Sequence, residues 1–326
     1  GVPEKQGWAF SAHGYRAARH DPSVDADRFG AMLRRARRPL SAGVLSDARD
    51  RYADRNADAF PRYFIIEPVA LCNRACPFCS ILVTNRSGLM AWPAFTKLMR
   101  ECQPHDVYGL SLYQLGEPFL WRGVDQTGRR LNIADMVDYA KLVGGFKAVN
   151  LSTNGDVPNL ECVLGSELDD LIISIDGTTA EVYNANRPST KPNDAGAFER
   201  TIERVMAFLA KKVEFAAYGQ KVPWVRLQII NKADTAGQVL DFVRQWIDVP
   251  GVDDVLVKHL DSMRPWLGSA VVSDEEDAAK AAALGAMPCQ HLYAIGSMVA
   301  DGRFNACCHD ARTELTTAGA NIDAMT

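Results

Sequence analysis

Apolar positions between residues 62 and 260 follow two alternating periods. Short apolar runs typical of buried strands recur at 63–66, 107–115, 148–152, 171–175, 225–230 and 255–257. Stripes with apolar residues three or four positions apart, typical of one helix face, lie between them at 95–102, 133–140, 202–209 and 239–247. Because strands and helices alternate six times, we expect a parallel sheet with helices packed outside it.

The flanking segments break this alternation. Residues 24–58 are rich in Ala, Arg and Asp and are expected to be helical. The tail predicts an Ala-rich helix near 274–284, then strands at 293–299 and 303–306. Asp301-Gly302 between these strands is a strong hairpin signal. The expected domains are an N-terminal helical extension (1–60), the α/β region (61–262) and a small cysteine-containing hairpin domain (263–326).

Composition narrows the classes of function. Of the 326 residues, 47% are hydrophobic and 23% charged, as in soluble globular proteins. A formal net charge of -4 argues against a broad nucleic-acid-binding surface. No uninterrupted apolar stretch is long enough to predict a membrane span, and the N-terminus shows no signal-peptide pattern. We therefore expect a cytoplasmic protein without nucleic-acid or membrane partners.

Cysteines carry the strongest chemical signal. Three of the eight cysteines, Cys72, Cys76 and Cys79, form a CxxxCxxC pattern directly after the first predicted strand. Three thiolates on one loop can bind three irons of a 4Fe-4S cluster and leave the fourth iron open to a chelating ligand. Zinc is the alternative, but structural zinc sites usually have four protein ligands.

The loop resembles the signature of the radical S-adenosylmethionine (SAM) superfamily, in which an aromatic residue, here Phe78, precedes the last cysteine. The resemblance covers about residues 62–260. It implies a partial (β/α)6 TIM-like barrel whose cluster binds and reductively cleaves SAM. The product would be a 5′-deoxyadenosyl radical that abstracts a hydrogen atom from substrate.

Three further segments, each after its own predicted strand, are similar to SAM-binding motifs of that superfamily. Their residues are Gly116, Glu117, Pro118, Ser152, Asn154, Ser174, Asp176 and Arg187. The resemblance implies that segment 116–118 binds the SAM amino group and that segment 152–155 contacts the ribose. It also implies that Ser174 contacts SAM and that Arg187 pairs with its carboxylate. One departure is Leu115, where the superfamily often has a second glycine.

A second cysteine set lies in the tail. Cys289, Gly302 and Cys307 are similar to the start of the SPASM or twitch extension, CX9–15GX4C. The resemblance implies an auxiliary 4Fe-4S cluster with Cys289 and Cys307 as ligands and Cys308 packing or substituting. No further cysteine follows before Thr326, so either the sequence is truncated or a residue such as Asp310 completes the ligand set.

These resemblances imply a radical SAM oxidoreductase acting on a small polar metabolite, such as a sugar or aminocyclitol. The auxiliary cluster would accept an electron, and flavodoxin or ferredoxin would be the one-electron reductant. Alternatives are a peptide-modifying maturase, a radical epimerase and a simple electron carrier. Cys102 is expected in the core. Candidate substrate contacts are Glu67, Tyr113, Arg226, Lys258 and Trp266.

Overall fold

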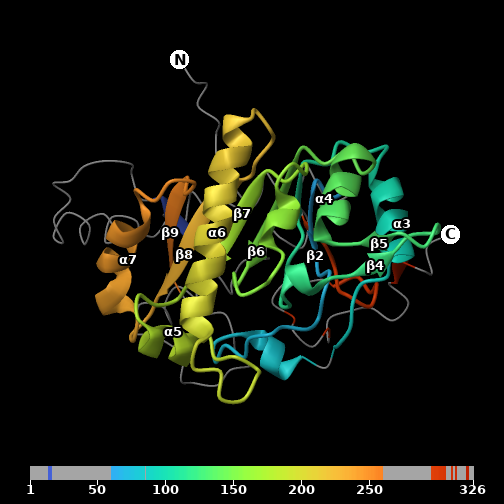
Figure 1. The fold of residues 1–326 in the computed structure, drawn as a ribbon. Helices are drawn as coiled ribbons and strands as arrows, with labels where there is room; N and C mark the ends of the chain where they lie inside the picture. Colours follow the sequence, from blue (N-terminus) through green and yellow to red (C-terminus); the bar gives the residue numbers. More distant parts are fainter. Residues whose placement is uncertain are drawn as a thin grey trace, which may run out of the picture.

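The computed structural model describes residues 14–16, 60–84, 86–259, 295–305, 310, 313 and 321–322. Its main feature is one eight-stranded sheet in the order β1-β9-β8-β7-β6-β3-β2-β10 (Figure 1). The strands are β1 (Gly14–Arg16), β2 (Tyr63–Ile66), β3 (Gly109–Ser111), β6 (Ala148–Thr153), β7 (Asp170–Ser174), β8 (Trp224–Asn231), β9 (Asp254–His259) and β10 (Ile295–Met298). All neighbouring pairs are parallel except β1 with β9.

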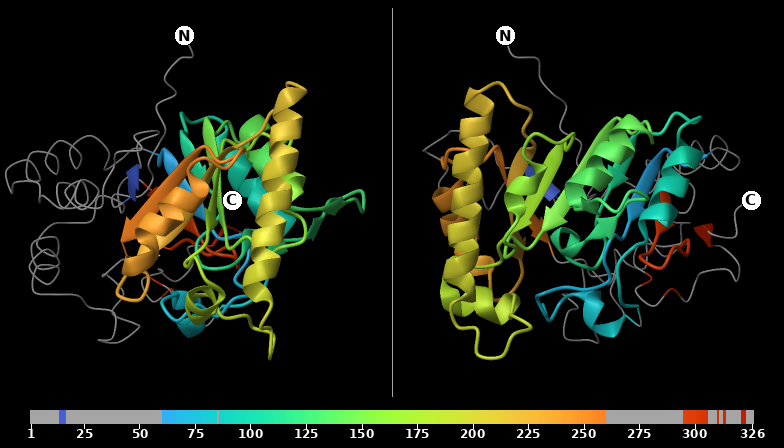
Figure 2. Two further views of the ribbon diagram at one scale, coloured as in Figure 1. Left: turned by 60° about the vertical axis from the view of Figure 1, so that its left-hand side comes forward. Right: turned by 45° about the vertical axis from the view of Figure 1, so that its right-hand side comes forward.

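Helices cover one face of this sheet. They are α3 (Trp92–Cys102), α4 (Ile133–Leu142), α6 (Ala197–Ala217) and α7 (Val239–Trp246), and α6 crosses in front of the central strands (Figures 1 and 2). Burial alternates along β6, where Val149, Leu151 and Thr153 are buried and the residues between them are half-buried. The fully buried positions belong to the core shared with the helices. The fold is therefore α/β with a mostly parallel sheet, as the sequence predicts.

Helix ends follow local sequence rules. The side chain of Asn132 accepts from the backbone N–H of Ala134, and Asp135 accepts from the Asn132 N–H, which forms a capping box at the start of α4. Pro93 occupies the first turn of α3, where its missing N–H costs no helical hydrogen bond. A hairpin of β4 (Gly123–Val124) and β5 (Arg130–Leu131) was not predicted.

The ends of the sheet differ from the sequence prediction. The predicted tail strand is β10, and it extends the main sheet in parallel with β2. The Asp301-Gly302 turn then reverses the chain, so that Met298 bridges Phe304 antiparallel, with Gly302 at φ +83°. The helices predicted at 24–58 and 274–284 lie outside the described residues, and Gly14–Arg16, before the first of them, forms a strand that was not predicted. The sheet thus has seven parallel strands where six were predicted.

The carboxyl ends of the parallel strands meet at one edge, and this edge positions the candidate site. The loop after β2 carries the cysteines and the 3-10 helix η1 (Ser80–Val83). The loop after β3 leads into η2 (Pro118–Leu120), and the loop after β7 leads into α5 (Ala180–Asn186). Figure 1 shows α5 and the cysteine-bearing segment together at the bottom of the sheet. Parallel sheets bind ligands at this edge.

Candidate functional site

The cysteine loop, residues 72–79, is held in place by a buried arginine within it. Arg74 is 1% exposed, and its guanidinium contacts Asp156 Oδ2 at 2.5 Å, the Arg187 carbonyl at 3.0 Å and Thr201 Oγ1 at 3.2 Å. The backbone also pairs across, because Ala75 N donates to the Pro188 carbonyl at 2.9 Å. Contacts from three distant segments therefore fix the conformation of the loop.

The three thiols of the loop are partly or fully shielded from solvent. Cys76 is buried, and Cys72 and Cys79 are half-buried. Burial, with a contribution from the Glu117 carboxylate, raises the pKa of Cys72 to about 12, and burial raises the pKa of Cys76 to about 11. Burial thus favours the neutral thiols, and a bound metal ion would favour the thiolates.

The donor set fits a cluster with several irons. Among the described residues, no three His, Cys, Asp or Glu side chains converge on a position that one metal ion could occupy. Three thiols on one loop at the ligand-binding edge of the sheet are a donor set that can bind three irons of a 4Fe-4S cluster.

Glu117 joins the ends of β3 and β6. Its Oε1 accepts from Thr153 Oγ1 at 2.8 Å and from the Phe119 N–H at 3.2 Å, and its Oε2 accepts from the Asn154 N–H at 2.8 Å. Burial raises the pKa of Glu117 to about 7, although these hydrogen bonds oppose the shift. The role of this carboxylate toward a SAM amino group stays a prediction.

Gly116 passes against the start of the cysteine loop. A Cβ atom at this position would lie 1.8 Å from the Val69 carbonyl oxygen and 2.9 Å from that of Leu71. The next residue, Glu117, donates its N–H to the same Leu71 carbonyl at 2.9 Å. The glycine is therefore required by close approach of two backbones, whichever residue precedes it.

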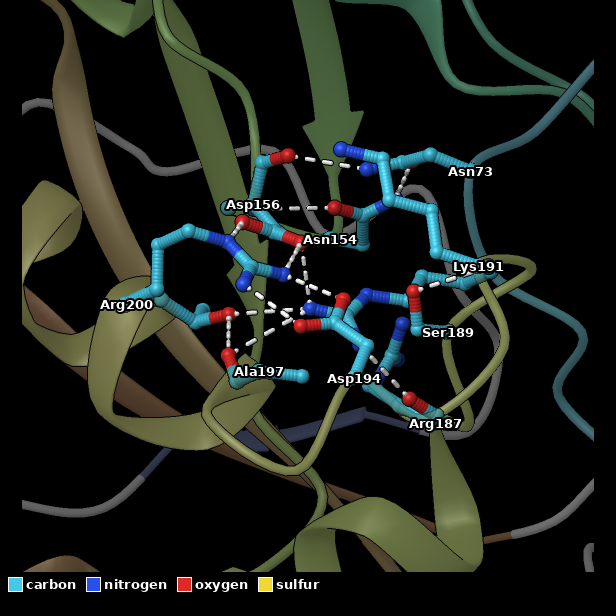
Figure 3. Close-up of polar contacts among 12 residues, drawn as sticks. Asn73, Asn154, Asp156, Arg187, Ser189, Lys191, Asp194, Ala197 and Arg200 are labelled. Atoms are coloured by element: carbon cyan, nitrogen blue, oxygen red, sulfur yellow. Dashed lines mark hydrogen bonds and ion pairs between the residues drawn. The ribbon is translucent and has the colours of Figure 1, made fainter.

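Asn154 lies beside the first cysteine. Its Nδ2 is 2.8 Å from Asn73 Oδ1 and 3.7 Å from Cys72 Sγ. Its Oδ1 accepts the N–H of Asp156 at 2.9 Å. Figure 3 shows Asn154 between Asn73 and Asp156. The residue is 4% exposed, so its amide serves contacts within the protein. A ribose contact from this segment stays a prediction.

Arg187 forms an ion pair with another predicted site residue. Its Nε is 2.8 Å and its terminal nitrogen 2.7 Å from Asp176 Oδ2, and both residues are buried. The second Asp176 oxygen accepts the Ile230 N–H at 2.7 Å. The guanidinium carbon also lies 6.0 Å from the Phe78 ring centre. The structure thus brings Arg187, Asp176 and Phe78 together, with the Arg187 fork directed at Asp176.

The other predicted residues lie at the same edge. Ser152 is half-buried on β6, Ser174 ends β7 and accepts from Gln228 Nε2 at 3.2 Å, and Pro118 begins η2. Cys289, Cys307, Cys308 and Trp266 lie outside the described residues.

Two candidate substrate contacts have other partners. Glu67 is fully buried and accepts two bonds from Arg86, at 3.0 and 3.1 Å. Arg226 pairs with Asp170 near the amino ends of β8 and β7, away from the candidate site. Cys102 is fully buried in the core on α3, as predicted.

Sequence reasoning missed the ion network behind the cysteine loop. Asp156 Oδ atoms accept from Arg74, from Arg200 at 2.9 Å and from Arg204 at 2.6 Å. Arg200 also binds both oxygens of Asp194 at 2.7 Å (Figure 3). The sequence feature that could have drawn attention to Arg74 is its place as a charged residue between two clustered cysteines. Nothing in the sequence paired it with Asp156, which lies 82 positions away.

Solved structures with a similar fold are known. SuiB of Streptococcus suis bound to S-adenosylmethionine matches with a TM-score of 0.53 and 14% identity, over 86% of this chain and 70% of that one. The structure of anSMEcpe with bound AdoMet and a Kp18Cys peptide matches with a TM-score of 0.53 and 17% identity, over 81% and 78%. SuiB bound to its precursor peptide SuiA matches with a TM-score of 0.53 and 12% identity, over 90% and 68%.

No family model matches the sequence, and no curated protein does so. The structural likeness is therefore one of fold. The described chain shares the α/β fold of these proteins, which were solved with bound S-adenosylmethionine or AdoMet. No helix among the described residues is both long and apolar enough to cross a membrane.

Proposed function

We propose that this protein is a radical SAM enzyme whose cluster is held by Cys72, Cys76 and Cys79. The observation that supports this most is the position of three thiols on one fixed loop at the carboxyl edge of a parallel sheet. When bound, the cluster supplies an electron that cleaves SAM to a 5′-deoxyadenosyl radical able to take a hydrogen atom from substrate.

The residues around the loop would prepare the site for this chemistry. Arg74 and the pairing with residues 188–190 hold the thiols at fixed positions. The Phe78 ring centre lies 6.0 Å from the Arg187 guanidinium carbon and 5.6 Å from the Lys232 ammonium nitrogen, so the ring contacts two cations beside the loop. Gly116 allows the backbone before Glu117 to approach the loop. Together these residues would fix the position of the thiols at the site.

The test is anaerobic reconstitution with iron and sulfide, followed by a SAM cleavage assay with a chemical reductant. We expect iron and sulfide in the protein and release of 5′-deoxyadenosine. Cys76→Ala should lose both, because a loop with two thiols cannot hold the cubane. Cys102→Ala, which removes a core thiol on α3, should keep both. Stoichiometric zinc in place of iron would refute the proposal.

For the reaction we propose oxidation of a small polar metabolite, such as a sugar or aminocyclitol. An auxiliary 4Fe-4S cluster bound by Cys289 and Cys307 would be the electron acceptor, and flavodoxin or ferredoxin the reductant of the first cluster. The tail pattern CX9–15GX4C supports this proposal. Cys307→Ala should then cleave SAM without forming oxidised product, and full product formation by this variant would contradict it.

Peptide modification is the second candidate. The support is that SuiB and anSMEcpe, both above a TM-score of 0.5, were solved with a precursor peptide and a Kp18Cys peptide. A test is calorimetric titration of the reconstituted protein with a peptide encoded beside its gene. Micromolar binding, followed by a mass change of that peptide on incubation with SAM and reductant, would favour this function over metabolite oxidation.

A further inference from the structure

The side-chain amide of Asn154 has a fixed orientation. Its Oδ1 accepts the Asp156 N–H at 2.9 Å, so this atom must be the oxygen. Its Nδ2 therefore points to the other side, where Asn73 Oδ1 lies at 2.8 Å and Cys72 Sγ at 3.7 Å. An amide that is 4% exposed and held at both ends has little freedom to turn away.

The Cys72 sulfur receives two N–H donors. The backbone N–H of Arg74 is 3.4 Å from Sγ, and Asn154 Nδ2 is the second donor. As a thiol, Cys72 can also donate to Asn73 Oδ1 at 3.9 Å. A thiolate bound to iron has no proton to donate, so only the two N–H contacts remain once the residue becomes a ligand.

We propose that Asn154 donates a hydrogen bond to the Cys72 thiolate and thereby makes the reduction potential of the cluster less negative. This inference rests on the proposed function, because it requires a cluster on Cys72. Addition of one electron raises the negative charge spread over the cluster sulfurs, and an N–H donor at a ligand sulfur stabilises that charge. Hydrogen bonds of this kind tune metal sites through their ligands.

The surrounding ion network serves as the support for this amide. Asn73 Nδ2 donates to the Asp156 carbonyl at 2.8 Å, which closes a ring of contacts with Asn154 (Figure 3). Asp156 is itself fixed by Arg74, Arg200 and Arg204. Asn154 is thus a positioning and tuning residue that acts on the cluster through Cys72.

The experiment is a redox titration of the reconstituted protein with dithionite, followed by electron paramagnetic resonance of the reduced cluster. Asn154→Leu has nearly the same size and no N–H donor, and Asn154→Ala lacks the donor without adding bulk. Asn159→Leu is the matched control, because Asn159 Nδ2 makes a similar contact, 3.9 Å, with the sulfur of Cys162 outside the loop.

We expect both Asn154 variants to keep iron and to show a midpoint potential more negative than wild type, with Asn159→Leu unchanged. If only Asn154→Leu loses the cluster, the midpoint potential of Asn154→Ala decides the outcome. An unchanged potential in an iron-loaded Asn154 variant would overturn the inference. Loss of iron from both variants with the fold retained would also do so, because the amide would then be needed for ligation. A wild-type protein without a cluster would refute the proposed function itself.

Discussion

At Gly116 two backbones approach so closely that a methyl group would lie 1.8 Å from the Val69 oxygen. We expect Gly116→Ala to destabilise the protein by about 2 kcal/mol or more, because the cysteine loop or the end of β3 must shift. Urea denaturation measures the change. Gly237→Ala is the control, since a Cβ there meets nothing within 4 Å, and it should change stability by less than about 0.5 kcal/mol.

Glu117 predicts a pH dependence of stability. Its folded-state pKa of about 7 is above the value of about 4.3 in an unfolded chain, so the folded state binds the proton more tightly. The contribution of Glu117 to the free energy of unfolding therefore falls as pH rises from about 4 through about 7. In metal-free protein, Glu117→Gln should lose less stability across this range than wild type. If the free energy of unfolding varied with pH in the same way in both proteins, the raised pKa of Glu117 would be contradicted.

Individual site residues could be predicted where a motif is local. The cysteines, Gly116 and Glu117 stand in short patterns after strands, and the structure places them at one edge of the sheet. The partners of Arg74 and Arg187 could not be predicted in this way. A buried guanidinium needs a carboxylate partner, but the partner of Arg74, Asp156, is distant in sequence. The ion pair of Arg187 with Asp176 was not predicted, and the pairing of Arg187 with the SAM carboxylate stays a prediction.

The cysteine loop is an element whose order depends on Arg74. Arg74→Met removes a cation that is buried against Asp156, so we expect the backbone pairing of 73–75 with 188–190 to open more often. Hydrogen exchange of peptides covering these residues should speed up by at least about tenfold, equivalent to about 1.4 kcal/mol.

The control for this prediction is Lys212→Met. It breaks the ion pair of buried Lys212 with half-buried Asp253, which lies just before the amino end of β9 and away from the cysteine loop. This variant should also lower overall stability. Hydrogen exchange in its cysteine loop should speed up only as much as the loss of global stability requires. Equal acceleration of the loop in both variants would show that Arg74 has no local role.

Secondary structure was predictable wherever apolar periodicity was strong. The predicted strand 63–66 matches β2, and each predicted helical stripe lies within α3, α4, α6 or α7 to within one residue. The second predicted strand, 107–115, is longer than the observed β3 for a physical reason. Residues after Ser111 leave the strand early, because the chain must bring Gly116 against the cysteine loop. Periodicity also cannot show that a tail strand joins the main sheet.

At the scale of the whole molecule, Glu67 connects three parts of the chain. It directly follows β2, accepts from Arg86 after the cysteines and accepts from the Ala300 N–H at 3.1 Å, at the turn after β10. Glu67→Gln should cost about 3 kcal/mol and speed hydrogen exchange in β10, because it removes the charge that balances Arg86.

An exposed ion pair provides the comparison for Glu67. The Arg62 and Asp106 side chains are 53% and 65% exposed, so Arg62→Gln should change stability by less than about 1 kcal/mol. Faster exchange in β10 for this variant as well would show that the effect of Glu67→Gln is not specific to the connection between β2 and the tail.

The pairing of residues 73–75 with partners more than a hundred positions later also sets an order of events during synthesis. The Pro188 carbonyl and the Thr201 hydroxyl have not yet been made when the cysteines leave the ribosome. A nascent chain that stops before residue 187 lacks both partners. Under the proposed function, the loop therefore reaches its iron-binding conformation only after translation has passed Thr201 in α6.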